Sequence, residues 1–314
     1  MKRGALTIIV GFMLTATLPN TVAYAGANRT FVATTGADTG TCPNTAPCRS
    51  FAYAITQTNA GGEIAVLGVA GYGAVTINKA ISITNDAGEA GVTTSTNGDA
   101  ITISAGPSDV VNLRGLTLVG GGVGTNGITF TSGAALNIQN TIIGGFTNNG
   151  IAILPSAGSL INVSDTVIFG NGANGVLVEP SATATNQMLF ERVQALGNAG
   201  TGFLMFGSNS TGGALKGTAA DCVASGNLIG FQAITGGVSE TQPVFTLDNA
   251  RAVNNGTGVT ASGQTATIFL KQSTISGSTA DGYSILSGAV IDTYGNNGIT
   301  DAANSGTLTP VGLQ

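Results

Sequence analysis

The chain has 314 residues, of which 49 are glycine, and only 8% are charged, with a formal net charge of −5. The glycines keep no three-residue period, which excludes a collagen helix, and a hydrophobic share of 42% argues against a disordered chain. A sequence pI of about 4.5 excludes the basic footprint of a nucleic-acid-binding protein. The chain contains no histidine and no tryptophan, so catalytic and metal sites that require histidine are excluded as well.

Residues 1–25 have the pattern of a secretory signal peptide. Lys2 and Arg3 form a basic start, an apolar run extends from Ala5 to Leu18, and Ala23-Tyr24-Ala25 supplies the small residues of a cleavage site. The apolar run is short for a membrane span, which disfavours an uncleaved anchor. We therefore expect export to the periplasm, the extracellular space or the cell surface, with no transmembrane segment in the mature chain, 26–314.

The cysteines fit an exported protein. Cys42 and Cys48 are separated by five residues that include two prolines, and in an oxidising compartment this loop predicts a disulfide. The alternative, a redox-active pair, is disfavoured because the spacing is not that of a Cys-x-x-Cys motif. Cys222 has no partner left, and we interpret it as a small buried thiol.

A short helix is predicted between this loop and the strands. Phe51, Ala54 and Ile55 have helical spacing, and Ser50 is a suitable N-cap residue. A strand-rich run then extends from Ala74 to Thr84. A helix ahead of the first strands would cover the open end of a repeat structure, which otherwise invites edge-to-edge association. We therefore assign 26–60 to an N-terminal cap and disulfide loop.

The rest of the chain contains an internal repeat. Short strand-like runs that open with glycine recur at intervals of 23 to 28 residues, at Gly127, Gly150, Gly175, Gly202, Gly230, Gly258 and Gly282. Short alternating strands at such a period are typical of a solenoid. Regularly placed hairpin turns are absent from the pattern, which argues against an antiparallel sandwich.

A second segment of each repeat shows which side chains face inward. Runs such as Leu136-Asn137-Ile138-Gln139-Asn140 alternate apolar and polar residues, so the apolar pair is expected inside. The fifth position is polar and suits a bend, because asparagine tolerates the left-handed backbone. A polar ladder is expected six residues further on, at Asn171, Asn198, Asn227 and Asn255. Three strands per turn with polar bends describe the coil of a parallel β-helix.

Particular motifs resemble one known group. They are Cys-x-x-Phe-x-x-Ala-Ile from Cys48, Ala-Gly-Gly-Glu-Ile-x-Val-Leu from Ala60 and Gly-Tyr-Gly-Ala-Val-Thr-Ile-x-Lys-Ala-Ile-x-Ile from Gly71. This opening looks like that of exported right-handed parallel β-helix repeat proteins of the pectin-lyase-like superfamily. The resemblance implies an all-β, single-stranded right-handed β-helix of about eight coils over about 61–300, with a tail at 301–314. It implies little about activity, since this fold supports many functions.

The familiar catalytic signatures of that superfamily are missing. The chain lacks the Trp-x-Asp-His segment of pectate lyases, the paired aspartates and Gly-His-Gly of polygalacturonases, and the Asp-Pro-His of alginate epimerases. Lyases that use lysine or arginine as the base, with Ca²⁺ held by carboxylates, are not excluded. In the bend column, Asp165, Arg192 and Asp221 follow one another on successive coils. Strands in a sheet lie about 4.8 Å apart, so these three side chains are expected to line up.

Two interpretations of that column stay open. It is either a small site, in which Arg192 binds an acidic sugar and the aspartates bind Ca²⁺ or act as acid and base, or an exposed ion-pair ladder. We favour the ladder, and with it an exported protein that binds or displays a surface for extracellular polysaccharide or cell-envelope material, with no cofactor. An acidic polysaccharide is the expected partner. The alternatives are a polysaccharide lyase or hydrolase with an atypical Asp/Arg site, and a structural or adhesive solenoid.

Overall fold

The computed structural model describes residues 26–86, 90–93, 97–181, 183–301 and 303–312. The predicted signal peptide, 1–25, lies outside the described residues. Within the described ranges, no helix combines the length and the apolar character that a membrane crossing requires.

Three parallel sheets make up the structure. Sheet A contains, in spatial order, β1 (Ala27–Val32), β2 (Thr58–Val66), β5 (Ile81–Thr84), β8 (Val110–Arg114), β11 (Ala135–Gln139), β14 (Leu160–Ser164), β17 (Thr185–Glu191), β20 (Ala214–Ala220), β23 (Gln242–Asp248), β26 (Thr267–Lys271), β29 (Val290–Thr293) and β31 (Thr309–Pro310). Sheet B contains β3 (Ala70–Gly71), β6 (Ala90–Thr93), β9 (Leu116–Val119), β12 (Ile142–Gly144), β15 (Val167–Phe169), β18 (Gln194–Leu196), β21 (Val223–Ser225), β24 (Arg251–Val253), β27 (Thr274–Ser276) and β30 (Gly298–Ile299). Sheet C contains β4 (Val75–Ile77), β7 (Ile101–Ser104), β10 (Ile128–Ser132), β13 (Ile151–Ile153), β16 (Val176–Val178), β19 (Thr201–Phe206), β22 (Ile229–Ile234), β25 (Thr257–Ser262) and β28 (Tyr283–Leu286).

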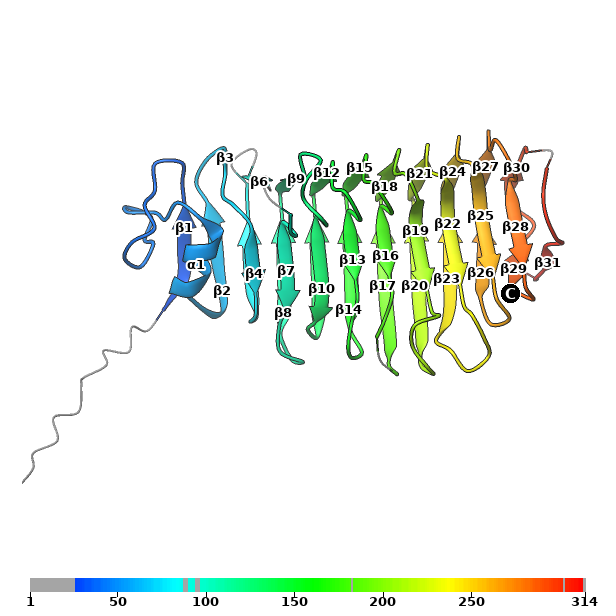
Figure 1. Ribbon diagram of the computed structural model, residues 1–314, viewed down its shortest axis with the longest axis horizontal. Helices are drawn as coiled ribbons and strands as arrows, with labels where there is room; N and C mark the ends of the chain where they lie inside the picture. Colours follow the sequence, from blue (N-terminus) through cyan, green and yellow to red (C-terminus); the bar gives the residue numbers. More distant parts are fainter. Residues whose placement is uncertain (1–25, 87–89, 94–96, 182, 302, 313–314) are drawn as a thin grey trace, which may run out of the picture.

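The chain visits the sheets in the order C, A, B and then starts the next coil one strand further along each sheet (Figure 1). Neighbouring strands pair in register, so that Ile138 lies beside Val163 and Val163 beside Phe190. This is a right-handed parallel β-solenoid of about eight turns, which confirms the predicted fold. β31 lies within the segment assigned to the tail and pairs with β29.

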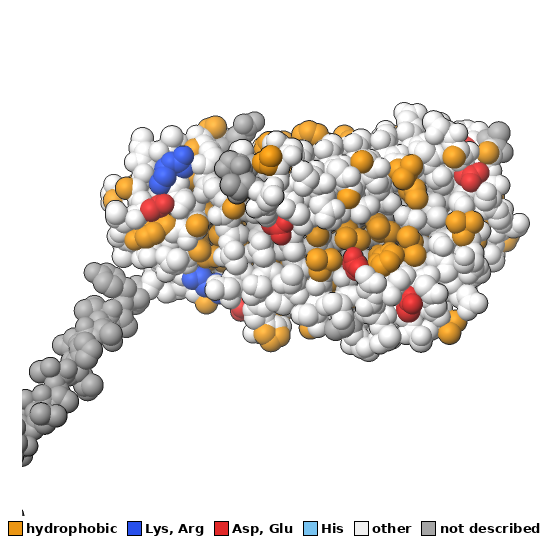
Figure 2. Space-filling model, in the orientation of Figure 1, with side chains coloured by type: hydrophobic (Ala, Val, Ile, Leu, Met, Phe, Trp, Pro, Cys, Tyr) orange, Lys and Arg blue, Asp and Glu red, His pale blue; other side chains and the backbone are white. Residues whose placement is uncertain are grey.

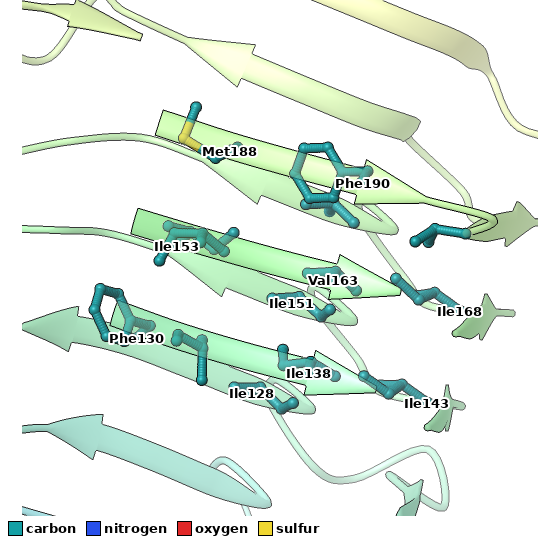
Figure 3. Packing of buried hydrophobic residues seen from close by; sticks show 14 of the residues in the cluster. Ile128, Phe130, Ile138, Ile143, Ile151, Ile153, Val163, Ile168, Met188 and Phe190 are labelled. Atoms are coloured by element: carbon teal, nitrogen blue, oxygen red, sulfur yellow. The ribbon is translucent and has the colours of Figure 1, made fainter. Parts of the chain in front are cut away.

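The interior is filled by side chains that alternate along each strand. Figure 3 shows Ile128, Ile138 and Ile143 of one coil pointing into the same space from three sheets, with Ile151, Val163 and Ile168 stacked on them. Further along the solenoid axis, the interior is filled by packed phenylalanine rings. Phe203 and Phe231 are stacked with ring centroids 5.0 Å apart, and Phe190 and Phe245 pack edge-on against them at 5.6 and 6.1 Å. Phe203 and Phe231 are register partners on sheet C, whereas Phe190 and Phe245 reach this pair from sheet A, where their register partners are the small residues Ala219 and Gly217.

Buried asparagines satisfy the backbone where strands end. Asn198 Oδ1 accepts hydrogen bonds from both the backbone N and Nδ2 of Asn171, and Asn227 Oδ1 does the same for Asn198. The predicted ladder Asn171, Asn198, Asn227 and Asn255 is thus confirmed. A second ladder, which the sequence analysis missed, runs through Asn126, Asn149 and Asn174.

The short helix predicted near the N-terminus is present. Helix α1 (Phe51–Gln57) begins after Ser50, whose Oγ accepts a hydrogen bond from the Tyr53 backbone N at 3.2 Å. Lys79 Nζ binds the carbonyl oxygens of Ile55 and Thr58 at the other end of the helix. These contacts tie α1 to the first coil and satisfy backbone groups that a helix end leaves unpaired.

Both predictions about cysteine are confirmed. Cys42 and Cys48 form a disulfide. Cys222 is a buried thiol, and burial raises its pKa to about 12. Its Sγ lies 3.3 Å from the carbonyl oxygen of Ala220. Thr141 and Thr166 occupy the same place on earlier coils and bond the corresponding carbonyl oxygens through Oγ1. Cys222 therefore takes the place of these threonines in a column of small side chains, each of which donates a hydrogen bond to a backbone carbonyl oxygen.

Candidate functional site

The three charged residues of the candidate site occupy the bend between sheets A and B. Their backbone φ angles are 50° at Asp165, 53° at Arg192 and 54° at Asp221, all in the left-handed region. Asn140 and Asn249 have the same conformation at the same bend, with φ of 48° and 51°. The bend position therefore requires a residue whose backbone tolerates a positive φ. The side chains at this position point outward from the coil.

Arg192 is held by two carboxylates of its own chain. Its Nε lies 2.6 Å from Asp165 Oδ1 and its Nη2 lies 3.0 Å from Asp165 Oδ2, while Nη1 contacts Glu191. The hydrogen bonds from Arg192 lower the pKa of Asp165, and those to Asp165 and Glu191 raise the pKa of Arg192. The positive charge of the guanidinium is thus already balanced within the protein.

Asp221 belongs to a different contact. Its Oδ1 accepts a hydrogen bond of 2.5 Å from Asn249 Nδ2, one coil further along. It lines a hollow of about 380 Å³ together with Asp248, whose carboxylate is paired with Lys271 Nζ at 2.8 Å. Within the described ranges, the ion-pair partners of Arg192 are Asp165 and Glu191. The structure therefore brings together two of the three candidate residues and places the third with an amide.

These residues do not fit a calcium site. Ca²⁺ takes about six to eight oxygen ligands, and in the described part of the chain no group of three or more acidic or cysteine side chains could hold a metal ion. Both oxygens of Asp165 are bound by the Arg192 guanidinium. A cation at Asp165 would have to replace the guanidinium of Arg192.

A larger hollow lies on the outer face of sheet A, across β14, β17, β20 and β23. It has a volume of about 520 Å³, and the outward side chains of successive strands line it. Thr218 of β20 lies between the register partners Leu189 and Thr246, and its short side chain leaves a trough beside the larger leucine. We call this hollow the Lys216 groove; it is lined by Leu160, Asn162, Gln187, Leu189, Lys216, Thr218, Val244 and Thr246.

Lys216 is exposed in this groove and, within the described ranges, has no ion-pair or hydrogen-bond partner. Three other cations outside the bend column form ion pairs: Arg29 with Glu63, Arg114 with Asp86 and Lys271 with Asp248. The sequence analysis did not single out Lys216. A signal was present, because Leu215, Gly217 and Ala219 alternate with it and are buried, which places Lys216 on the outside.

A row of amides leads along sheet A to the groove. Asn137 Nδ2 donates to Asn112 Oδ1 and Asn162 Nδ2 donates to Asn137 Oδ1, each at 2.8 Å. On the next strand the register position is Leu189, which cannot continue the row. Asn162 Oδ1 is therefore an acceptor at the edge of the groove with no donor among the described residues.

Charged side chains are sparse on the face of the molecule that Figure 2 draws. The face drawn in Figure 2 carries a few separate Asp, Glu, Lys and Arg side chains, and hydrophobic side chains gather over its central part. The five ion pairs of the described structure are each partly exposed to solvent. The Lys216 groove thus combines an unpaired charge with neutral hydrogen-bonding groups, which the bend column does not.

Comparisons with known proteins agree on the fold. No protein-family model and no curated protein matches the chain in sequence. Among solved structures, a pectate lyase has a TM-score of 0.56 and 15% identity, covering 91% of this chain and 80% of its own. An alginate lyase from Paenibacillus sp. has a TM-score of 0.51 and 11% identity, covering 90% of this chain and 100% of its own.

The A-module of a mannuronan C-5 epimerase from Azotobacter vinelandii has a TM-score of 0.48 and 16% identity, covering 84% of this chain and 91% of its own. The structural comparison rests on the two lyases, whose sequence identity to this chain is low. The chain has the right-handed parallel β-helix fold that these pectate and alginate lyases share.

Proposed function

We propose that this protein binds an extended acidic polysaccharide along the outer face of sheet A, with a uronate carboxylate at Lys216. The observation that carries the proposal is the unpaired ammonium of Lys216 in a groove of hydroxyl, amide and apolar groups. A carboxylate bound there would gain a charge-assisted hydrogen bond without displacing an existing ion pair.

The remaining groups of the groove suit sugar rings. Thr218, Thr246 and Asn162 offer hydroxyl and amide groups to sugar hydroxyls, while Leu160 and Leu189, which are 45% and 39% exposed, offer apolar surface to the ring faces. Neighbouring strands of a sheet lie about 4.8 Å apart. A polymer that follows the solenoid axis would therefore meet a new set of outward groups at a spacing comparable to the length of one sugar residue.

The structural comparisons support the choice of ligand class. Pectate and alginate, the substrates named for the two lyases of this fold, are both acidic polysaccharides. Catalysis at Asp165, Arg192 and Asp221 is less well supported, because Asp165 and Glu191 already balance the charge of Arg192. We therefore propose binding as the function, and a role for the bend column in cleavage as the alternative that experiment must decide.

Binding is tested by isothermal titration of purified protein with oligogalacturonate and with oligoalginate. Lys216→Met keeps the length of the side chain and removes its charge, and we expect binding to weaken by about tenfold or more, since hydrogen bonds to charged groups contribute about 1.5–3 kcal/mol. Arg251→Met is the matched control, because Arg251 is also an exposed cation without a partner among the described residues but lies on sheet B. Equal binding by wild type and Lys216→Met would contradict the proposal.

The catalytic alternative is tested separately. Pectate and alginate are incubated with the protein, with and without Ca²⁺, and the release of unsaturated or reducing ends is measured. We expect no turnover above the buffer control. Turnover that is lost in the triple variant Asp165→Asn, Arg192→Gln, Asp221→Asn, with unchanged thermal unfolding, would instead establish a lyase or hydrolase at the bend column.

A further inference from the structure

A third hollow, of about 510 Å³, lies at the N-terminal end of the solenoid, in a different part of the molecule from the Lys216 groove. It is bounded by α1, by β4 with the residues that flank it, and by the start of β7. We call it the Thr76 hollow; the side chains that matter here are Ile55, Thr76, Asn78, Lys79, Asp99 and Thr102. It lies where α1 packs beside β4, the first strand of sheet C (Figure 1).

Neutral donors and acceptors line one side of the hollow. Thr76 and Thr102 are register partners on β4 and β7, and their neighbours Val75, Ile77, Ile101 and Ile103 are buried, so the two threonines face outward. Neither hydroxyl has a hydrogen-bond partner among the described residues, and the same holds for the Asn78 amide. Three polar groups, two on adjacent strands and one directly after β4, are thus left for a ligand.

Two charged groups complete the hollow without forming an ion pair. Lys79 Nζ donates to two backbone carbonyl oxygens, those of Ile55 and Thr58, and an ammonium has three donors, so one N–H is left. Asp99 Oδ1 accepts from the backbone N and Nδ2 of Asn126 at 3.1 and 3.0 Å, so Oδ2 is left as an acceptor. The hollow therefore offers one charged donor and one charged acceptor with no net charge.

We propose that the Thr76 hollow is a second carbohydrate site, which binds an uncharged sugar through its hydroxyl groups. A sugar hydroxyl both donates and accepts, so adjacent hydroxyls can donate to Asp99 Oδ2 and accept from Lys79 Nζ and the threonines. The exposed methyl groups of Ala52 and Ala74 provide a small apolar surface at the rim of the hollow. A uronate is disfavoured by Asp99 and a cationic sugar by Lys79, so the ligand class differs from that of the Lys216 groove.

The site is tested with neutral tetrasaccharides as probes. Cello-, manno- and xylotetraose are titrated into isotopically labelled protein, and amide shifts are followed by NMR. At least one of them should shift resonances of β4, β7 and α1. The double variant Thr76→Val/Thr102→Val should weaken its binding by about thirtyfold, because two hydrogen bonds of about 1 kcal/mol each are lost while the β-branched shape is kept.

Controls separate this proposal from the previous one. Thr117→Val alters a partly exposed threonine on the outer face of sheet B and should leave binding of the neutral sugar unchanged. Lys216→Met should weaken oligogalacturonate binding and leave neutral binding intact. The proposal is overturned if none of the three tetrasaccharides shifts the resonances of the hollow, or if the double variant binds as tightly as the wild type.

Discussion

Two polar positions, six residues apart in four of the coils, are similar in sequence but have different structural roles. The bend column holds Asn140, Asp165, Arg192, Asp221, Asn249 and Gln272, all with φ between 48° and 54°. The ladder column holds Asn171, Asn198, Asn227 and Asn255, all buried and bonded to one another. At the bend, asparagine is suitable because its backbone tolerates a positive φ. In the ladder, it is suitable because its side-chain amide both donates and accepts hydrogen bonds.

This difference explains why charges occur in one column and not in the other. At the bend the side chain points to solvent, so any residue that tolerates a left-handed backbone at acceptable cost can stand there, including arginine and aspartate. In the ladder the amide must both donate and accept in the interior, and a charge would be buried without a partner. A charged residue at a bend is therefore weak support for function in this fold.

The largest effect is expected in the ladder. Asn227 Oδ1 accepts from the backbone N and Nδ2 of Asn198, and Asn227 Nδ2 donates to the Ala195 carbonyl oxygen. Asn227→Leu would leave these buried groups unsatisfied, and we expect it to lower the free energy of unfolding by about 3 kcal/mol. Urea unfolding followed by circular dichroism measures the change. A loss below about 1 kcal/mol would mean that the ladder adds little to stability.

A smaller loss is expected when the bend receives a residue that disfavours its backbone. Asn140 is exposed, with φ of 48°. Asn140→Val should cost about 1–2 kcal/mol, because a β-branched residue resists the left-handed conformation. Asn140→Gly serves as the control and should be close to neutral in the same unfolding assay. If Val and Gly behave alike, backbone conformation does not govern this column.

Removing the charges of the bend should matter less still. For Asp165→Asn/Arg192→Gln we expect a small decrease in thermal stability at neutral pH, since exposed ion pairs contribute little. Arg192 lowers the pKa of Asp165 below its ordinary value of 3.8. The contribution of the pair is therefore present above that pH and is lost as the pH falls through the lowered pKa. Melting curves of both proteins should converge on acidification, and a gap that widens would contradict this assignment.

The smallest effect is expected at Cys222. Thr141 and Thr166 fill the same place and make the same bond to the carbonyl oxygen two residues earlier. Cys222→Thr should therefore change the free energy of unfolding by less than about 1 kcal/mol. Because burial raises the pKa of the thiol to about 12, native wild type should react with a thiol reagent only on unfolding. Rapid labelling of the folded protein would show that the thiol is accessible.

Much of the fold can be predicted from the chain. The period-two pattern of strands such as Leu136-Asn137-Ile138 and the return of polar bends every 23 to 28 residues require stacked parallel strands, because only that arrangement buries every apolar pair. The N-cap at Ser50 and the Cys42–Cys48 disulfide are local features and follow from nearby residues. The second asparagine ladder was missed although a signal was present, because Asn126, Asn149 and Asn174 each directly precede a glycine that opens a repeat.

The candidate binding surfaces depend on contacts that a linear pattern does not contain. Sequence spacing places Asp165, Arg192 and Asp221 in one column, yet only tertiary structure decides that Arg192 pairs with Asp165 and Glu191 while Asp221 bonds with Asn249. Likewise, Lys216 is unpaired because the outward neighbours on adjacent coils, Gln187 and Val244, carry no charge. The sequence by itself determines which side chains face inward, since the strand period sets their direction. Which outward side chains meet is set by the register between coils, because partners there are 20 to 30 residues apart in the chain.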